Sequence, residues 1–411
     1  MVSSSVDAIG RCKHKLSKRQ KSNKGQDLIS NLPDHIIGCV LSFLPTKDAV
    51  STSVLSKRWI YLWTFITKLD FDDIGYCSSN EIRKACFVDF VDRVLLRLNS
   101  EHIRSFSLKM SEKYDSSYIN KWISIVINLR VRKLRVYLQN DLAVSSDPLL
   151  KCQSLEELVL SRCAITLSTF VCLSSLAVLN LYCIIISCSS SNDSKTLTLN
   201  FPVLRKFVTF GCILSGVKSV ILQVPLLEVV SISYHPFYRT SHAEIKFYAS
   251  RIATFCYYGH MSDTILFEGH SVASADITLY NKNKKSPQEI GIFVCKLLSI
   301  NPECLKLSVH GCISQFVKHS FADIRPFKML RHLELSFVGC NNLLGILLKS
   351  PCLETLILEE YYKGMLLSLA NVPLCLVSTL KVLKFEIFGR SKRGLSVAKF
   401  FYRKWSGIGE N

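Results

Sequence analysis

The feature that most constrains this chain is a short apolar motif that recurs along most of its length. The motif has the form apolar-x-x-apolar-x-apolar, as in the segments 155–160, 330–335 and 353–358. Twelve copies begin at positions 103, 131, 155, 176, 204, 227, 252, 274, 302, 330, 353 and 380, so successive copies lie 21 to 28 residues apart. Self-similarity at such a period indicates a repeat array in which every unit is one small structural element.

The apolar-x-apolar core of each copy predicts a short strand whose alternate side chains point inward. One unit cannot bury its apolar face alone, so neighbouring units must stack; the period is close to the roughly 20 to 29 residues of leucine-rich repeats. We therefore expect an α/β fold dominated by a curved leucine-rich-repeat solenoid over residues 100–388. One strand per unit should form a parallel sheet, and Leu176–Leu181 should be one of these strands.

Residues 28–63 have a different pattern, which predicts three short helices. Pro33 and Asp34 suit a first helical turn, because a missing N–H costs little there and a carboxylate meets the positive end of the helix dipole. Pro45 ends this helix, and Thr46 and Ser56 can cap the second and third. The apolar residues expected on the three helices are Ile36, Ile37, Val40, Leu41, Leu44, Val50, Val54, Trp59, Leu62 and Trp63.

Three helices of this size make a poor core on their own. Part of their apolar surface is therefore expected to bind a partner, with Leu41 and Trp59 near its centre. The alternative is that all of this surface packs against the domain that follows.

The same segment resembles the F-box of plant F-box/leucine-rich-repeat proteins. The matching residues are Leu32-Pro33-Asp34, Ile36-Ile37, Leu41, Leu44 to Val50, Ser53 to Trp59 and Leu62-Trp63, with a typical continuation into Leu69 to Asp72. The resemblance implies a non-enzymatic substrate-recognition subunit of a Skp-cullin-F-box ubiquitin ligase. The F-box would dock on the Skp adaptor, and through it on a cullin, while the repeats would recruit an unknown protein substrate.

The residues expected at the adaptor are Leu32, Pro33, Ile36, Ile37, Val40, Leu41, Leu44, Pro45, Val50, Leu55, Trp59, Leu62 and Trp63. The outward positions of the repeats are candidates for the substrate, such as Glu156, Glu157, Arg205, Lys206, Arg331 and His332. These positions are not constrained by the repeat, so the sequence does not name the substrate.

The expected domain organisation follows these patterns. It comprises a disordered basic arm (1–26), the F-box (27–70), a linker or N-terminal cap helix (71–99), the repeats (100–370), a segment resembling the start of an FBD domain (371–390) and a basic tail (391–411). The tail lacks the acidic helix and last strand found in FBD relatives, so we expect that domain to be partial. Clustered Lys and Arg in the arm are either a nuclear-import or nucleic-acid-contacting segment or a solvated tail.

Composition restricts the compartment and the chemistry. The 17 cysteines are odd in number and include no Cys-x-x-Cys pair. They are expected to be reduced, many of them as small buried apolar residues at repeat positions, in the nucleus, the cytoplasm or both. No metal or cofactor is expected, and no phosphate-binding glycine loop or hydrolase motif occurs.

Two other readings are weaker. Ala164–Asn192 carries no charge, but it contains the fourth motif copy in register, so no membrane span is expected. The net charge of +19 raises the alternative of a basic repeat scaffold or nucleic-acid-associated protein without a ligase role. Basic residues interleaved with aromatic ones, as on a base-stacking surface, are absent, so nucleic acid is not expected to be the partner.

Overall fold

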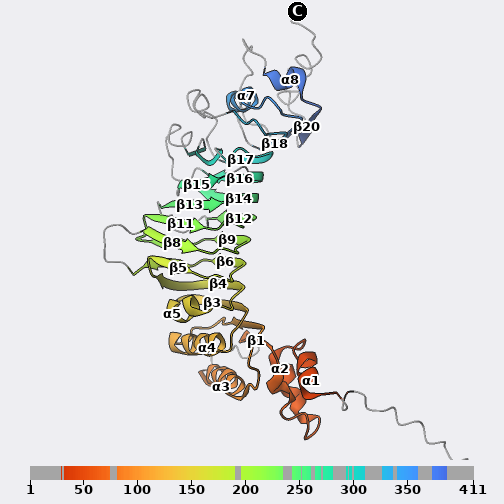
Figure 1. Cartoon of the computed structure of the whole chain (residues 1–411), viewed down its shortest axis with the longest axis vertical. Helices are drawn as coiled ribbons and strands as arrows, with labels where there is room; N and C mark the ends of the chain where they lie inside the picture. Colours follow the sequence, from red (N-terminus) through yellow and green to blue (C-terminus); the bar gives the residue numbers. More distant parts are fainter. Residues whose placement is uncertain are drawn as a thin grey trace, which may run out of the picture.

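The computed structural model describes residues 29, 32–74, 81–189, 196–234, 243–250, 252–260, 264–269, 272–280, 293–294, 296–298, 300–310, 326–336, 340–359 and 373–386. The expectations for residues 1–26 and 391–411 lie outside these ranges. Within them the chain forms a small helical module at one end of an elongated stack of strands (Figure 1).

The N-terminal module contains two α-helices and two short 3₁₀ segments. These are α1 (Asp34–Leu41), α2 (Thr46–Ser51), η1 (Thr52–Val54) and η2 (Leu62–Phe65). The expected third α-helix, capped by Ser56, is not formed. The Trp59 N–H donates to the Ser56 carbonyl (3.0 Å) and the Leu62 N–H to the Trp59 carbonyl (3.3 Å), so these bonds span three residues and the segment is wound more tightly than an α-helix.

Thr46 also differs from its expected role. It is the first residue of α2, whose cap position is occupied by Pro45 without a side-chain hydrogen bond. The Thr46 hydroxyl instead accepts a hydrogen bond from the Asp70 N–H (2.7 Å), which joins the module to the first strand of the repeats.

The repeats form one large parallel sheet, which confirms the predicted fold. Its main path runs β1-β2-β3-β4-β6-β9-β12-β14-β16-β17-β18-β19-β20 within a sheet of 15 described strands. The strands on this path are β1 (Lys68–Asp72), β2 (Ser105–Lys109), β3 (Lys133–Val144), β4 (Glu157–Leu167), β6 (Val178–Tyr182), β9 (Lys206–Phe210), β12 (Val229–Ser233), β14 (Ile252–His260), β16 (Val272–Tyr280), β17 (Cys304–His310), β18 (His332–Ser336), β19 (Thr355–Glu359) and β20 (Val382–Glu386). All twelve motif copies lie on strands of this path, and β1 adds a thirteenth strand before them.

The register aligns the central apolar position of every unit. Leu69 pairs with Phe106, Phe106 with Leu134 and Leu134 with Leu158, and the same row continues to Leu383. Most of this row is fully buried. Since burying one such side chain contributes about 1.5–3 kcal/mol, the stacked row is a main source of stability.

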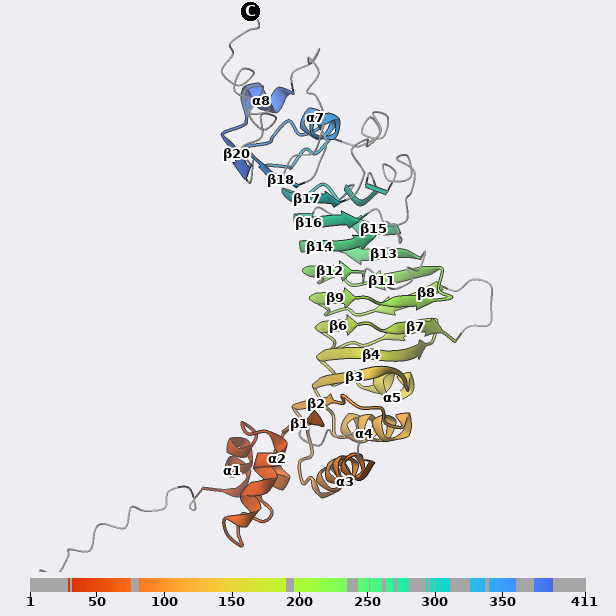
Figure 2. The same cartoon turned by 180° about the vertical axis from the view of Figure 1, so that it is seen from behind.

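Two kinds of element cover the inner face of this sheet (Figure 2). Near the N-terminal end these are helices: α3 (Glu81–Arg97), α4 (Ser116–Asn128) and α5 (Ser146–Lys151). In the middle, a second parallel sheet takes their place, with the order β15-β13-β11-β8-β5. Its strands are β5 (Phe170–Cys172), β8 (Thr196–Asn200), β11 (Ser219–Gln223), β13 (Glu244–Ala249) and β15 (Thr264–Gly269).

Short elements complete the stack. The strands β7 (Ile185–Cys188) and β10 (Ile213–Ser215) pair with each other, and the helices α7 (Cys340–Leu348) and α8 (Leu374–Ser378) lie at the C-terminal end (Figure 1). Among the described residues no helix is long and apolar enough to cross a membrane. The uncharged segment considered for that role forms strands, including β6 at the predicted place.

Candidate functional site

Helix α1 has two apolar faces, of which one is buried and the other exposed. Ile37 and Leu41 lie four residues apart and pack into the core of the module. Ile36 and Val40 are also spaced by four, so they share a second, neighbouring face, and both are exposed, as is Leu32 just before the helix. A helix at a solvent surface normally places polar residues on that side. The outer face of α1 is therefore an exposed apolar face, which is unusual for a helix at a solvent surface.

The exposed apolar surface extends beyond this helix. Phe43 follows α1 with 86% of its surface exposed, and Val54 in η1 is 85% exposed. The large exposed apolar side chains of the module are Ile29, Leu32, Ile36, Val40, Phe43, Leu44, Val54, Leu55, Ile60 and Tyr61. So many exposed large apolar side chains on one small module are typical of an interaction site. We call this set the outer apolar surface.

The inner side of α1 leaves little freedom to the module. A Cβ atom added at Gly38 would lie 2.5 Å from the Phe65 Cβ and 3.0 Å from the Phe65 carbonyl carbon. Only glycine lets the helix approach η2 this closely. Helix α1, which carries part of the outer apolar surface, therefore packs directly against the segment that leads to the repeats.

Arg58 holds the start of α1 in place. Its guanidinium donates to the Leu32 carbonyl and to Asp34 Oδ1, the latter at 2.8 Å. Both partners are exposed, so the pair is screened and contributes modestly to stability. Its effect is to position the residues at the edge of the outer apolar surface.

The structure divides the thirteen residues predicted for the adaptor into three groups. Those exposed are Leu32, Pro33, Ile36, Val40, Leu44, Pro45 and Leu55; those half-buried are Val50 and Trp59; those buried are Ile37, Leu41, Leu62 and Trp63. Leu41, expected near the centre of the binding surface, is only 3% exposed and belongs to the core of the module. A charge at this position would disrupt folding, so it does not test binding.

Sequence reasoning missed five exposed residues: Ile29, Phe43, Val54, Ile60 and Tyr61. Phe43 lies beyond the end of α1, where helical spacing no longer predicts which side a residue occupies. Val54 was assigned to a helical face without any indication that this face is open. Exposure here depends on how the segments pack, which a single sequence does not display.

The junction between module and repeats is made of several buried or half-buried contacts. The Thr67 N–H donates to the Ser42 hydroxyl (3.0 Å), which itself donates to the Gly38 carbonyl (2.9 Å). The Asp70 N–H donates to the Thr46 hydroxyl (2.7 Å), and the Asn99 N–H donates to the Thr64 carbonyl (2.9 Å). These contacts fix the direction of the module relative to the first strands.

The charged residues proposed for the substrate are mostly engaged with neighbouring units. Arg205 pairs with Glu228, and Arg331 pairs with Glu354 at 3.0 Å. Glu157 accepts from Arg135 (2.8 Å) on the adjacent strand. These ion pairs link consecutive turns, so their first role is between units of the stack.

The outward face of the central strands is nearly free of charge. On β6, β9, β12 and β14 the outward positions are Val178, Asn180, Tyr182, Lys206, Val208, Phe210, Val229, Ser231, Ser233, Thr254, Cys256 and Tyr258, of which only Lys206 is charged. Next to them Tyr280 donates to the Tyr258 hydroxyl (2.8 Å) and stacks on His310 at 4.8 Å. An uncharged, partly aromatic centre is the composition found at protein interfaces.

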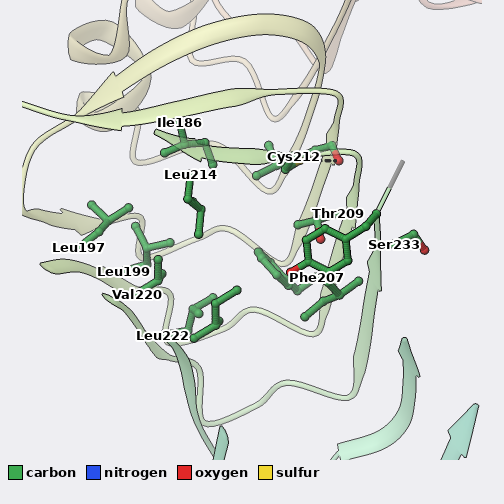
Figure 3. Close-up of a pocket in the computed structure, with 14 residues that line it drawn as sticks. Ile186, Leu197, Leu199, Phe207, Thr209, Cys212, Leu214, Val220, Leu222 and Ser233 are labelled. Atoms are coloured by element: carbon green, nitrogen blue, oxygen red, sulfur yellow. Dashed lines mark hydrogen bonds between the residues drawn. The ribbon is translucent and has the colours of Figure 1, made fainter. Parts of the chain in front are cut away.

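A small apolar pocket lies between the two sheets (Figure 3). Its volume is about 60 Å³, and Leu199, Leu222 and Phe207 are among the side chains around it. An apolar cavity of this size offers few hydrogen-bonding partners, so water is not stabilised in it. It is too small for a cofactor, and we interpret it as imperfect packing between the sheets.

The described residues hold no candidate metal cluster, and two of their cysteines have unreactive thiols. No group of three or more His, Cys, Asp or Glu side chains is arranged there to hold a metal ion. Burial raises the pKa of the Cys163 thiol to about 12 and likewise that of Cys212 to about 12. Thiols in this state are protonated and unreactive at neutral pH.

Comparison with known protein families agrees with this division. Residues 29–74 match the F-box domain, and residues 95–370 match the At1g61320/AtMIF1, LRR domain. The first match contains every residue of the outer apolar surface, and the second contains the strands from β2 to β19.

Individual relatives come from Arabidopsis thaliana. The F-box/FBD/LRR-repeat protein At3g14710 is 38% identical over 218 residues, which cover 52% of this chain and 48% of the relative. The F-box/LRR-repeat protein At4g14103 is 46% identical over 115 residues, which cover 28% of this chain and 30% of the relative. The chain thus spans about half the length of the first relative and less than a third of the second.

Proposed function

The chain belongs to the F-box/leucine-rich-repeat proteins, and from this premise we propose that it is the substrate-recognition subunit of a Skp-cullin-F-box ubiquitin ligase. The F-box would dock on a Skp-type adaptor, and the repeats would bind the protein to be modified. The single observation that carries the proposal is the outer apolar surface, with Phe43 and Val54 almost fully exposed.

Binding rather than catalysis is the role that this geometry supports. Interfaces take most of their affinity from a few large side chains that become fully buried in the complex. The outer apolar surface offers such side chains from α1, η1 and the segment before η2. The ligase chemistry would then belong to other subunits of the complex.

The junction gives the second part of the mechanism. Hydrogen bonds from Thr67 to Ser42 and from Asp70 to Thr46 connect the module directly to β1. A further bond runs from the Asn99 N–H to the Thr64 carbonyl (2.9 Å). A protein held on the repeats would therefore be presented at a defined position relative to the adaptor, which favours transfer by proximity.

The cellular site follows as a further part of the proposal. Such a ligase subunit would act in the nucleus, the cytoplasm or both. A fluorescent fusion with and without residues 1–26 checks whether the basic arm directs the protein to the nucleus.

Adaptor binding by purified variants tests the main proposal. Phe43→Asp and Val54→Asp should each leave the fold intact, because both side chains are solvated in the free chain. Each should weaken adaptor binding by about 3 kcal/mol, roughly a hundredfold in Kd, since an unpaired carboxylate would be buried in the complex.

The matched control is Leu96→Asp on α3, where the leucine is 75% exposed and lies outside the F-box. It should bind the adaptor like the parent chain. Normal adaptor affinity in both F-box variants would contradict the proposed role of this surface.

A further inference from the structure

A groove on the first repeats has a different character from the outer apolar surface. It has a volume of about 640 Å³, within the roughly 300 to 1,000 Å³ typical of ligand sites. Its walls carry Arg104, Arg130 and Arg132 together with His102 and a single acidic residue, Glu156. Its lining contains no Phe, Tyr or Trp side chain.

The backbone explains why these arginines gather. The Arg104 N–H donates to the Thr67 carbonyl (2.8 Å), and the Lys133 N–H donates to the Arg104 carbonyl (3.1 Å). Thr67, Arg104 and Arg132 therefore occupy equivalent turns, each just before a strand of the stack. Arg130 reaches the same edge from the end of α4, where its backbone adopts a left-handed conformation (φ 51°).

The charges of this groove are only partly neutralised within the chain. Arg132 is ion-paired with Glu156. Arg104 and Arg130 are both exposed and form no ion pair with the residues that the structure describes. Two guanidinium groups are thus available at one concave site, and guanidinium binds carboxylates in bidentate geometry.

We propose that this groove binds a short acidic segment of a partner protein, through carboxylates paired with Arg104 and Arg130. The chain's own N-terminal arm is not the occupant, because its Arg11 to Lys24 region is basic and would be repelled. Single-stranded nucleic acid is disfavoured because the groove lacks the Phe, Tyr and Trp side chains on which bases stack.

The position of the groove connects it to the proposed function. Thr67 lines the groove and also donates its N–H to Ser42 of the F-box. An acidic segment bound here would lie directly beside the module that docks on the adaptor. The identification of the occupant as the protein to be modified rests on the proposed function, whereas the binding of an acidic peptide does not.

Fluorescence anisotropy with the purified chain, without adaptor, tests the inference. The probe is a fluorescein-labelled peptide of alternating Glu pairs and Gly, and a peptide with Gln in place of Glu is its neutral counterpart. The acidic peptide should bind, more weakly as salt is raised, and the neutral one should not. The double variant Arg104→Glu/Arg130→Glu should raise the Kd about tenfold or more, whereas Arg104→Lys/Arg130→Lys should keep part of the affinity.

Arg83→Glu is the matched control. Arg83 is exposed in the first turn of α3, about 20 Å along that helix from the end nearest the groove. It should change the Kd less than twofold. Equal binding by the parent and the double glutamate variant would overturn the inference, as would equal binding of the neutral peptide. Displacement of the probe by oligothymidylate at lower concentration than by unlabelled peptide would assign the groove to nucleic acid instead.

Because no adaptor is present, a failed peptide experiment leaves the adaptor role standing. Conversely, lost adaptor binding in Phe43→Asp together with intact peptide binding would separate the two surfaces. Circular dichroism of each variant confirms that the exposed substitutions leave the fold unchanged.

Discussion

The F-box module and the repeats are equally rich in large apolar residues, yet they place them differently. Along the repeats, the central row from Phe106 to Leu356 is buried by the units on either side. In the module, Phe43 and Val54 remain in solvent. A stacked unit finds its apolar partner in the next unit of the same chain, whereas these two side chains are not covered by any of the residues that the structure describes.

This difference separates stability from recognition. Substitutions in the repeat core should affect folding, whereas substitutions on the outer apolar surface should affect binding alone.

The largest effect is expected from Phe255→Ala. Phe255 is fully buried on β14, and its ring packs edge-on against Phe267 of the second sheet at 5.0 Å. The cavity left behind should lower the free energy of unfolding of the surrounding repeats by about 3–5 kcal/mol, measured by urea denaturation. The exposed Tyr248→Ala on the neighbouring sheet is the control and should cost below about 1 kcal/mol. Similar losses for both would contradict the picture of a tightly packed core between two sheets.

A smaller, local effect is expected from Gly38→Ala. The new methyl group would collide with Phe65, so α1 must shift, at a cost of about 1–3 kcal/mol. Hydrogen exchange should become faster in the module and remain unchanged in the repeats. Cys39→Ala, at an exposed position of the same helix, should have no such effect. Uniform acceleration along the whole chain would show that the module and the repeats unfold as one unit.

The smallest effect concerns the exposed ion pairs between units. The hydrogen bond from Lys381 and the charge of Arg331 hold the pKa of the Glu354 carboxyl below its usual range. The folded-state pKa is lower than the unfolded one, so the contribution to stability is present above the unfolded pKa and is lost as the pH falls through the folded one. Because the group is solvated, the effect should be slight.

The matching experiment compares Lys381→Ala with the parent by urea denaturation at neutral and at acidic pH. The parent should be marginally more stable at neutral pH, and the difference should disappear once Glu354 is protonated. A difference of the same size at both pH values would assign it to lost packing of the lysine side chain.

The sequence predicts the repeats well because their signal is local. Alternation within each motif determines which residues point inward, and the structure places strands at all twelve copies. The additional strand at the start of the path, β1, carries the same pattern in Ile66, Leu69 and Phe71. On sequence alone it is assigned to the end of the F-box. The second sheet was missed because its strands have only short alternations, such as Leu197 and Leu199.

The docking surface was predictable only in outline. Ile36 and Ile37 are adjacent and identical, yet one is exposed and the other is buried. Which of them faces outward depends on how closely α1 approaches Phe65, a property of packing that a single sequence does not contain. The basic groove was missed for the same reason, since Arg104 and Arg132 come together only when consecutive units stack.

The measurement that tests the central claim most directly is a calorimetric titration of a purified Skp-type adaptor into the full chain at several temperatures. Burial of the outer apolar surface predicts a stable complex with a negative heat-capacity change, because apolar surface is removed from water. Val54→Asp should reduce both the affinity and the magnitude of this change. A chain that gives no binding heat at any temperature and no complex in size-exclusion chromatography would contradict the account.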